Sequence, residues 1–271
     1  MRAFLIAFIT LACLNLPAGA EPWPIADMNK MVDQTNFIVD DRCSGTLISL
    51  KEKLLLTNNH CVQHKVSVIE EEIVGEDGSI NKVKREKFDD IPVTQNHYKG
   101  FAQVGSSAFQ TEIVAHDKKR DLAILRFKQD AIPFVIAAPI LPNGIDLVRG
   151  ELITIVGNPM LMEASVVRGE ISSLTRQIEV GGDKRDYIQI SGGMFGGNSG
   201  GALYNERGQL IGIPAAGSPS ATFIGLAIPV QSAKDMLKQH CLASVFDPQA
   251  DDVKCKAEKE KKTDSKQDKE G

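Results

Sequence analysis

Short hydrophobic runs, separated by Gly, Pro, Asn or Asp, recur along most of the chain. Apolar runs of about four to eight residues bounded by such turn residues predict β-strands. The segment Asn205-Glu206-Arg207-Gly208 is typical of a hairpin turn between two of these strands. The predicted strands are 45–50, 53–57, 122–127, 152–156, 166–172, 187–190, 201–204, 209–213 and 222–228.

Only one segment of the chain has a convincing helical period. After Pro229, the apolar residues Val230, Ala233, Leu237 and Cys241 recur at spacings of three or four residues. Many short strands and a single late helix predict an all-β fold, built as a sandwich or as barrels.

A proline-rich segment divides the chain into two halves of similar size. Residues 131–144 carry three prolines and predict an extended linker between a first unit, 21–130, and a second unit, 145–246. Within the first unit, residues 70–100 are charged and irregular, so we expect a long loop or insertion there.

The two ends of the chain differ in composition from its centre. Arg2, the apolar run 3–14 and the small residues Ala18 and Ala20 are typical of a cleaved signal peptide, 1–20. We therefore expect an exported protein, periplasmic or secreted. An uncleaved anchor and a lipoprotein acylated at Cys13 are weaker alternatives. The tail 247–271 has seven Lys, eight acidic residues and almost no apolar residue, so we expect it to be disordered.

Composition and charge narrow the class of function. The chain has a net charge of −4, which is not the basic footprint of a nucleic-acid-binding protein. Without the signal peptide, four cysteines remain: Cys43, Cys61, Cys241 and Cys255. An even number in an exported chain suggests disulfides, and three pairings are open. The cysteine spacings do not suit a zinc site, so we expect no metal.

Three local motifs carry residues suited to nucleophilic catalysis. The apolar strand 53–57 leads through Asn58-Asn59 to His60, and a Cys43–Cys61 bridge would fasten that turn to the neighbouring strand. Asp121 stands at the head of the apolar strand 122–127, where a carboxylate can orient an imidazole. Ser199 lies in Gly196-Gly197-Asn198-Ser199-Gly200-Gly201, a turn whose consecutive N–H groups can stabilise an oxyanion.

Together, in the order His, Asp, Ser, these motifs resemble the chymotrypsin-like serine proteases. The segments GNSGGAL, DLAIL and GLAIPV look most like the protease domain of the HtrA/Deg group, and the resemblance runs from Cys43 to about His240. It implies two antiparallel β-barrels with a C-terminal helix and an active site in the cleft between the barrels. About thirty residues follow His240, so we expect no PDZ module there.

The resemblance also implies roles for individual residues. Ser199 is the expected nucleophile, His60 the general base and Asp121 the residue that orients His60. The backbone N–H groups of Gly197 and Ser199 form the expected oxyanion hole, and hydrolysis runs through an acyl-enzyme without a cofactor. Asn198 replaces the Asp of digestive proteases, so we expect activity without cleavage of a zymogen.

The primary specificity pocket is predicted by position in the family. Gly193 and Met194 are expected at its base, and Pro214, Ala215, Ala216 and Gly217 along one wall. None of these residues is charged, which favours small or medium apolar side chains of the substrate. We assign no chemistry to Gly157-Asn158-Pro159 or to the segment 225–229.

A second hypothesis keeps the protease-like fold without hydrolysis. In that case the chain captures peptides or unfolded proteins and does not cut them. Both hypotheses expect polypeptide partners, no nucleic acid and no stable membrane span. The sequence leaves open the oligomeric state, the physiological substrate and whether Cys241 and Cys255 pair or remain free thiols.

Overall fold

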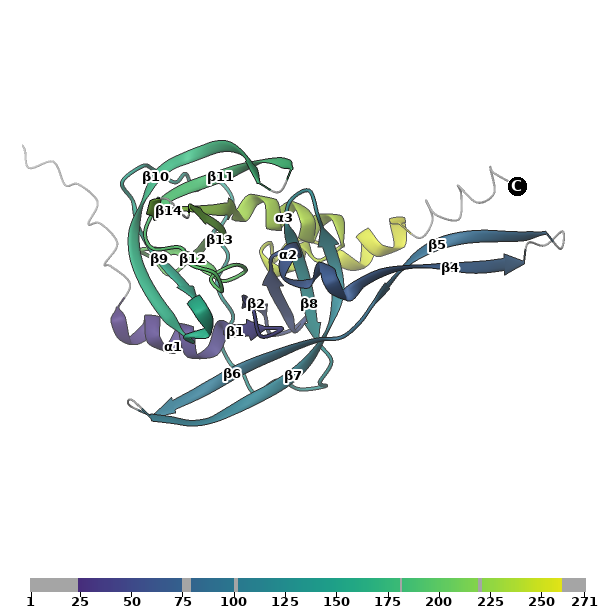
Figure 1. Cartoon of the computed structure of the whole chain (residues 1–271), viewed down its shortest axis with the longest axis horizontal. Coiled ribbons are helices and arrows are strands. Elements are labelled where there is room, and N and C mark those ends of the chain that lie inside the picture. Colours follow the sequence, from purple (N-terminus) through teal and green to yellow (C-terminus); the bar gives the residue numbers. More distant parts are fainter. Residues whose placement is uncertain (1–23, 75–78, 100–101, 181, 219–220, 260–271) are drawn as a thin grey trace, which may run out of the picture.

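Two β-barrels lie side by side, and a two-stranded arm projects away from them (Figure 1). The structure is a computed structural model that describes residues 24–74, 79–99, 102–180, 182–218 and 221–259. The predicted signal peptide lies outside these residues.

The first barrel closes in the strand order β1-β2-β3-β8-β7-β6, with antiparallel pairing. Its strands are β1 (Asn36–Val39), β2 (Cys43–Ser49), β3 (Leu54–Thr57), β6 (Ile91–Lys99), β7 (Ala102–Asp117) and β8 (Leu122–Phe127). Strands β4 (Val66–Val74) and β5 (Ile80–Phe88) pair only with each other among the described residues and form the arm.

The second barrel closes in the order β10-β11-β14-β13-β12-β9. Its strands are β9 (Leu152–Gly157), β10 (Ser165–Val180), β11 (Asp183–Ser191), β12 (Ala202–Asn205), β13 (Leu210–Ser218) and β14 (Ala221–Pro229). Helix α3 (Val230–Gln239) follows directly. The predicted all-β fold, with two antiparallel barrels and a C-terminal helix, is therefore confirmed.

Strand β3 shows why some strands are apolar without alternation. Leu55 faces the interior of the first barrel, whereas Leu54 and Leu56 belong to the cluster that joins the two barrels. In β8, Ala123 and Leu125 likewise point inward, while Ile124 packs in the shared cluster. Because both faces of these strands are buried, a continuous apolar run is the pattern that folding requires.

The segment between the barrels contacts both of them. Ala138 N donates to Leu47 O of the first barrel at 2.8 Å, and Leu141 N donates to Leu210 O of the second at 3.0 Å. Residues 131–144 contain neither a helix nor a strand. None of the helices in the described residues is long and apolar enough to cross a membrane.

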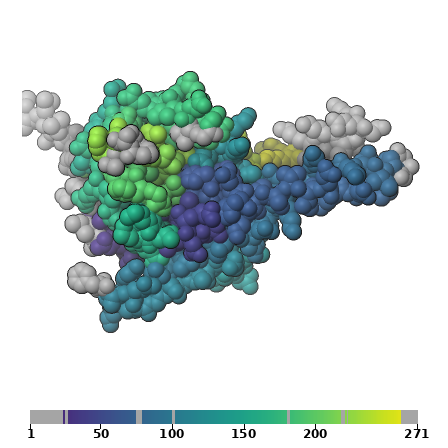
Figure 2. Space-filling model, in the orientation of Figure 1, coloured from purple at the N-terminus to yellow at the C-terminus, as the bar shows by residue number. Residues whose placement is uncertain are grey.

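The prediction of a long loop at 70–100 is wrong. The residues of this range that the structure describes belong mainly to two long antiparallel hairpins, β4–β5 and β6–β7. The arm lacks the apolar alternation of a half-buried strand because most of its side chains are exposed (Figure 2). Helix α1 (Ile25–Thr35) was also missed, since its buried face is narrow: among residues 27–35, the buried ones are Met28, Val32 and Thr35.

The prediction that the tail 247–271 is disordered is wrong for residues 247–259, the part that the structure describes. Residues 252–259 are helical. A disulfide joins Cys255 to Cys241, and the Asp252 carboxylate accepts from Ser244 N at 3.2 and 3.3 Å. These attachments order a segment whose own apolar surface is too small to fold it.

Candidate active site

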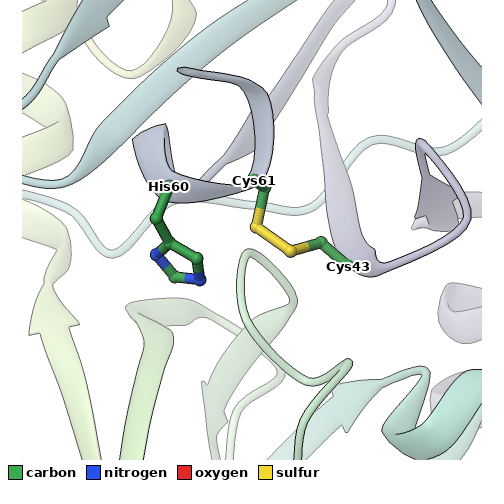
Figure 3. Close-up of side chains that lie close together, drawn as sticks. All are labelled: Cys43, His60 and Cys61. Carbon is green, nitrogen blue, oxygen red and sulfur yellow. A yellow bond between two sulfur atoms is a disulfide. The ribbon is translucent and has the colours of Figure 1, made fainter. Parts of the chain in front are cut away.

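His60 is presented by a single helical turn, α2 (Asn59–Val62), that directly follows β3. The disulfide Cys43–Cys61 ties this turn to the start of β2 (Figure 3). The ligand atoms of Cys43, His60 and Cys61 lie within 4.8 Å of one another. Because the two sulfurs are bonded to each other, neither is a thiolate, and the trio does not fit a metal ion.

Asp121 holds both the backbone and the ring of His60. Its Oδ1 accepts from His60 N at 2.9 Å, and its Oδ2 lies 2.9 Å from His60 Nδ1. Asp121 is buried, and its carbonyl accepts from Asn58 Nδ2 at 2.8 Å. A carboxylate at Nδ1 favours the tautomer in which Nε2 is free to accept a proton.

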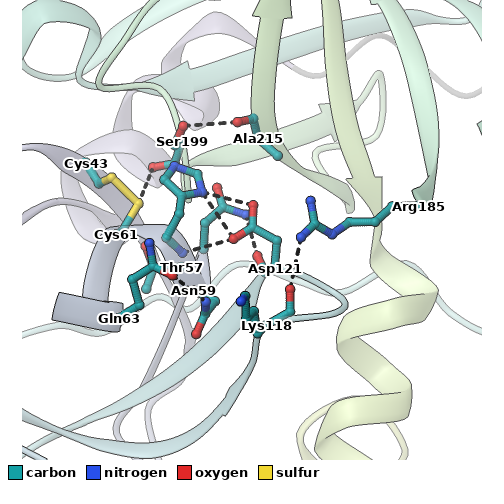
Figure 4. Close-up of polar contacts among 12 residues, drawn as sticks. Cys43, Thr57, Asn59, Cys61, Gln63, Lys118, Asp121, Arg185, Ser199 and Ala215 are labelled. Carbon is teal, nitrogen blue, oxygen red and sulfur yellow. Dashed lines mark hydrogen bonds and ion pairs between the residues drawn. A yellow bond between two sulfur atoms is a disulfide. The ribbon is translucent and has the colours of Figure 1, made fainter. Parts of the chain in front are cut away.

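Ser199 reaches this region from the second barrel. Ser44 N donates to Ser199 O at 2.8 Å, and Cys61 Sγ lies 3.9 Å from the same carbonyl, which joins the serine loop to the His60 turn. Ser199 Oγ donates to Ala215 O at 3.3 Å (Figure 4). Among the described residues, no hydrogen bond joins Ser199 Oγ to His60.

The turn before Ser199 leaves two backbone donors open. Asn198 N donates to Phe195 O at 3.1 Å, and Gly197 has φ +101°, a conformation that favours glycine. Gly196 O accepts from Met160 N at 2.7 Å. Within the described part of the chain, the N–H groups of Gly197 and Ser199 donate to no acceptor.

Two of the predicted specificity residues, Met194 and Gly217, lie against each other. Met194 is buried, and a side chain at Gly217 would come within 2.7 Å of its carbonyl oxygen. A side chain at Gly193 would come within 2.7 Å of the Phe195 ring. Pro214, Ala215 and Ala216 precede Gly217 on β13. Glycine at 217 therefore allows Met194 to pack closely against β13, and glycine at 193 leaves room for the Phe195 ring.

A hollow of about 290 Å³ opens beside His60. Apart from Asp121, the charged side chains around it were not found by sequence reasoning, because they come from strands and turns that are distant in the chain. Arg185 of β11 donates to Lys118 O at 3.0 Å and to Lys119 O at 2.7 Å, which joins the second barrel to the turn before Asp121. The lining residues are Asn59, His60, Gln63, Lys118, Asp121, Asp183, Arg185 and Ala215.

The competing candidates for the same roles are engaged elsewhere. Asp117, the rival of Asp121, pairs with Arg120 at 2.6 Å. His64 contacts Asp40 at 2.7 Å, and His97 contacts Ser107 at 2.7 Å. His116 lies 3.0 Å from Glu86 and 3.1 Å from Asn59.

A family model described as the trypsin-like peptidase domain matches residues 43–213, more than half of the 271 residues. The chain belongs to the trypsin-like peptidase family. This assignment agrees with the two barrels and with the meeting of His60 and Asp121 in the first of them.

Relatives of this trypsin-like peptidase domain include proteases of the Deg type. Serine endoprotease DegS of Haemophilus influenzae is 25% identical over 215 residues, which cover 76% of this chain and 52% of that protein. Protease Do-like 1, chloroplastic, of Arabidopsis thaliana is 33% identical over 144 residues, 49% of this chain and 31% of that protein. The chain thus spans about half or less of the length of these relatives.

A solved structure titled HtrA-type protease AlgW with decapeptide has a similar fold. Its TM-score is 0.52 and its sequence identity 28%, over 75% of this chain and 51% of that one. The expected resemblance to the HtrA/Deg group is thereby confirmed, together with the trypsin-like fold.

Proposed function

We propose that this chain is a serine endopeptidase that cuts polypeptides through an acyl-enzyme on Ser199. The observation that carries the proposal is the contact of the buried Asp121 carboxylate with His60 Nδ1 at 2.9 Å. Such a pair leaves His60 Nε2 as the base for a neighbouring hydroxyl. The family assignment and the Deg-type relatives support the same reaction.

In the proposed reaction, Ser199 Oγ bonds to the substrate carbonyl carbon while its proton passes to His60 Nε2. The N–H groups of Gly197 and Ser199 stabilise the resulting oxyanion. His60 then gives the proton to the leaving amine, and water releases the acyl group by the reverse steps. Ser199 Oγ, which donates to Ala215 O, reaches His60 by rotation about its Cα–Cβ bond.

The proposed setting is outside the cytoplasm, in the periplasm or the medium. Two disulfides join residues 18 and 14 positions apart, Cys43–Cys61 and Cys241–Cys255. Disulfides of this kind persist in oxidising compartments. This agrees with the signal peptide expected at 1–20.

To test the proposal, a chain that lacks residues 1–20 is treated with a fluorophosphonate. The labelled residue is then identified by mass spectrometry. Labelling should be confined to Ser199, and both Ser199→Ala and His60→Ala should abolish it together with peptide hydrolysis. Ser107→Ala is the matched control, because Ser107 Oγ lies 2.7 Å from the ring of His97 but belongs to β7 and not to the proposed oxyanion turn. Label on Ser107, or hydrolysis that survives Ser199→Ala, would exclude the proposal.

A second candidate function is capture of peptides without hydrolysis. The observation in its favour is that Ser199 Oγ hydrogen-bonds to Ala215 O and not to His60. In that case a folded sample binds peptides but takes no label. Labelling of Ser199 at a rate that depends on His60 would exclude this alternative.

A further inference from the structure

The proposed oxyanion turn is anchored at its first peptide. Gly196 O accepts from Met160 N at 2.7 Å. The C=O and N–H of a trans peptide point in opposite directions, so this bond turns the N–H of Gly197 away from Met160. A side chain at Gly197 would overlap Asn158 O, so the turn lies directly against the segment Asn158–Met160.

Ser44 anchors the next peptide of the turn. Ser44 is fully buried, and its Oγ lies 2.7 Å from Gly197 O. The same Oγ accepts from Asn158 N at 2.8 Å and from Asn158 Nδ2 at 3.0 Å. With both lone pairs engaged, the hydroxyl proton of Ser44 has Gly197 O as its acceptor.

The side chain of Asn158 makes four hydrogen bonds. Nδ2 donates to Phe37 O at 2.7 Å as well as to Ser44. Oδ1 accepts from Asn36 Nδ2 at 2.7 Å and from Ala164 N at 3.0 Å. Both hydrogens and both acceptor sites of the amide are used, and the residue is fully buried. An isosteric Asp would lose both donated bonds.

We propose that Ser44 and Asn158 are positioning residues that aim the Gly197 N–H at the oxyanion. The inference rests on the proposed function. Gly196-Gly197 is conformationally free by itself, because glycine visits both signs of φ readily. The Met160 amide fixes the peptide that carries the Gly197 N–H, and the Ser44 hydroxyl fixes the peptide that follows it. With both flanking peptides held, rotation about the bonds of the Gly197 Cα is restricted. Preorganised donors of this kind act on the transition state more than on the bound substrate.

The experiment measures kcat and KM for a chromogenic peptide with Ser44→Ala and Asn158→Asp. We expect kcat to fall by about tenfold to a hundredfold, somewhat less than the loss of an oxyanion donor itself, while KM stays within about twofold. Affinity for a peptide aldehyde, whose adduct carries the oxyanion, should fall in parallel with kcat. Affinity for a peptide in a Ser199→Ala background should not change.

Ser49→Ala is the matched control, because Ser49 lies on the same strand and its Oγ accepts only from Glu52 N, at 3.1 Å, among the described residues. It should leave kcat unchanged. If Ser44→Ala does not fold, Asn158→Asp carries the test, since it removes two donors without changing volume. The inference would be overturned if a folded Ser44→Ala or Asn158→Asp variant had the kcat of the wild type. It would also be overturned if the variant lost as much affinity for the peptide as for the aldehyde. Absence of hydrolysis in the wild type would instead reject the proposed function.

Discussion

At the scale of single residues, Gly200 shows how closely the two barrels approach at the serine. Its φ is +82°, and a side chain there would overlap Ser44 O and Thr57 Oγ1, both on the first barrel. Gly200 N also donates to Pro214 O at 2.9 Å in the second barrel. Both the backbone conformation and the space therefore require glycine, whereas sequence reasoning could argue only from the sharp turn.

Gly200→Ala should destabilise the chain far more than Gly144→Ala. Gly144 has a similar φ of +77°, but a side chain there meets nothing within 4 Å. We expect Gly144→Ala to cost about 1 kcal/mol from the backbone alone, and Gly200→Ala to cost about 3 kcal/mol or more and abolish fluorophosphonate labelling. Denaturant unfolding measures both costs. Similar costs for the two variants would show that the clash at Gly200 is relieved.

At the scale of elements, helix α3 packs on the second barrel with a lysine on its buried face. Lys234 is 2% exposed, and its Nζ donates to Asn143 Oδ1 at 2.9 Å and lies 5.5 Å from the centre of the Phe246 ring. Burial lowers the pKa of Lys234 from its ordinary value of 10.5, and Lys238 lowers it further while Asp235 opposes the change. The long aliphatic part of the side chain fills the space beside the helix.

Lys234→Met should be tolerated, whereas Lys234→Ala should not. Because the pKa is lower in the folded chain, the unfolded chain binds the proton more tightly. The contribution of Lys234 to the free energy of unfolding is therefore highest above pH 10.5, where Lys234 is neutral in both states. It decreases as the pH falls from 10.5 to the lowered pKa of the folded chain. We expect the Met variant to equal or exceed the wild type by up to about 1 kcal/mol at pH 7, with the difference shrinking towards pH 11.

The Ala variant should be about 2 kcal/mol less stable than the Met variant at both pH values, because it leaves a cavity and, like Met, carries no titratable group. Thermal unfolding between pH 7 and pH 11 distinguishes these outcomes. A Met variant that is less stable than the wild type at pH 7 would mean that the hydrogen bond to Asn143 outweighs the cost of burial.

At the scale of the whole molecule, the β4–β5 arm projects away from the two barrels (Figure 1). Its strands are joined by an antiparallel backbone ladder, and exposed ion pairs such as Glu71–Arg85 at 3.3 Å contribute little individually. At its base, Glu86 lies 3.0 Å from His116, and the Phe88 ring packs edge-on against the same histidine. The arm therefore adds little to the packing of either barrel.

Shortening the arm should leave the proposed reaction intact. Replacing residues 70–84 by Asn-Gly joins Ile69 to Arg85, which are paired in the ladder, and keeps Glu86 and Phe88. We expect labelling of Ser199 within about twofold of the wild type and a melting temperature within about 3 °C. Loss of labelling in a folded variant would show that the arm acts on the cleft.

The strands and the late helix could be read from the chain because their signals are local. Apolar runs such as Leu54–Leu56 and the period of α3 reflect burial that neighbouring residues share. The arm was not predicted because no hydrophobic core constrains its sequence pattern. The helix at 252–259 was not predicted because a disulfide to Cys241 orders it. His60, Asp121 and Ser199 were predictable as candidates from motifs, and their roles as a catalytic set stay a proposal.

Local pattern alone was enough for the all-β class, most of the barrel strands and the family, because hydrophobic spacing and short motifs are properties of consecutive residues. It missed β1, β6 and β7 of the first barrel. Only the folded chain joins Ser44 to Gly197, 153 residues away, or Asn158 to Asn36, 122 residues away. Such bonds form because the closed barrels bring distant segments into one buried network. A buried donor must be hydrogen-bonded, and the tertiary packing decides which acceptor lies within reach. That dependence is why Asn158 looked like a simple turn residue in sequence and became the centre of a hydrogen-bond network in three dimensions.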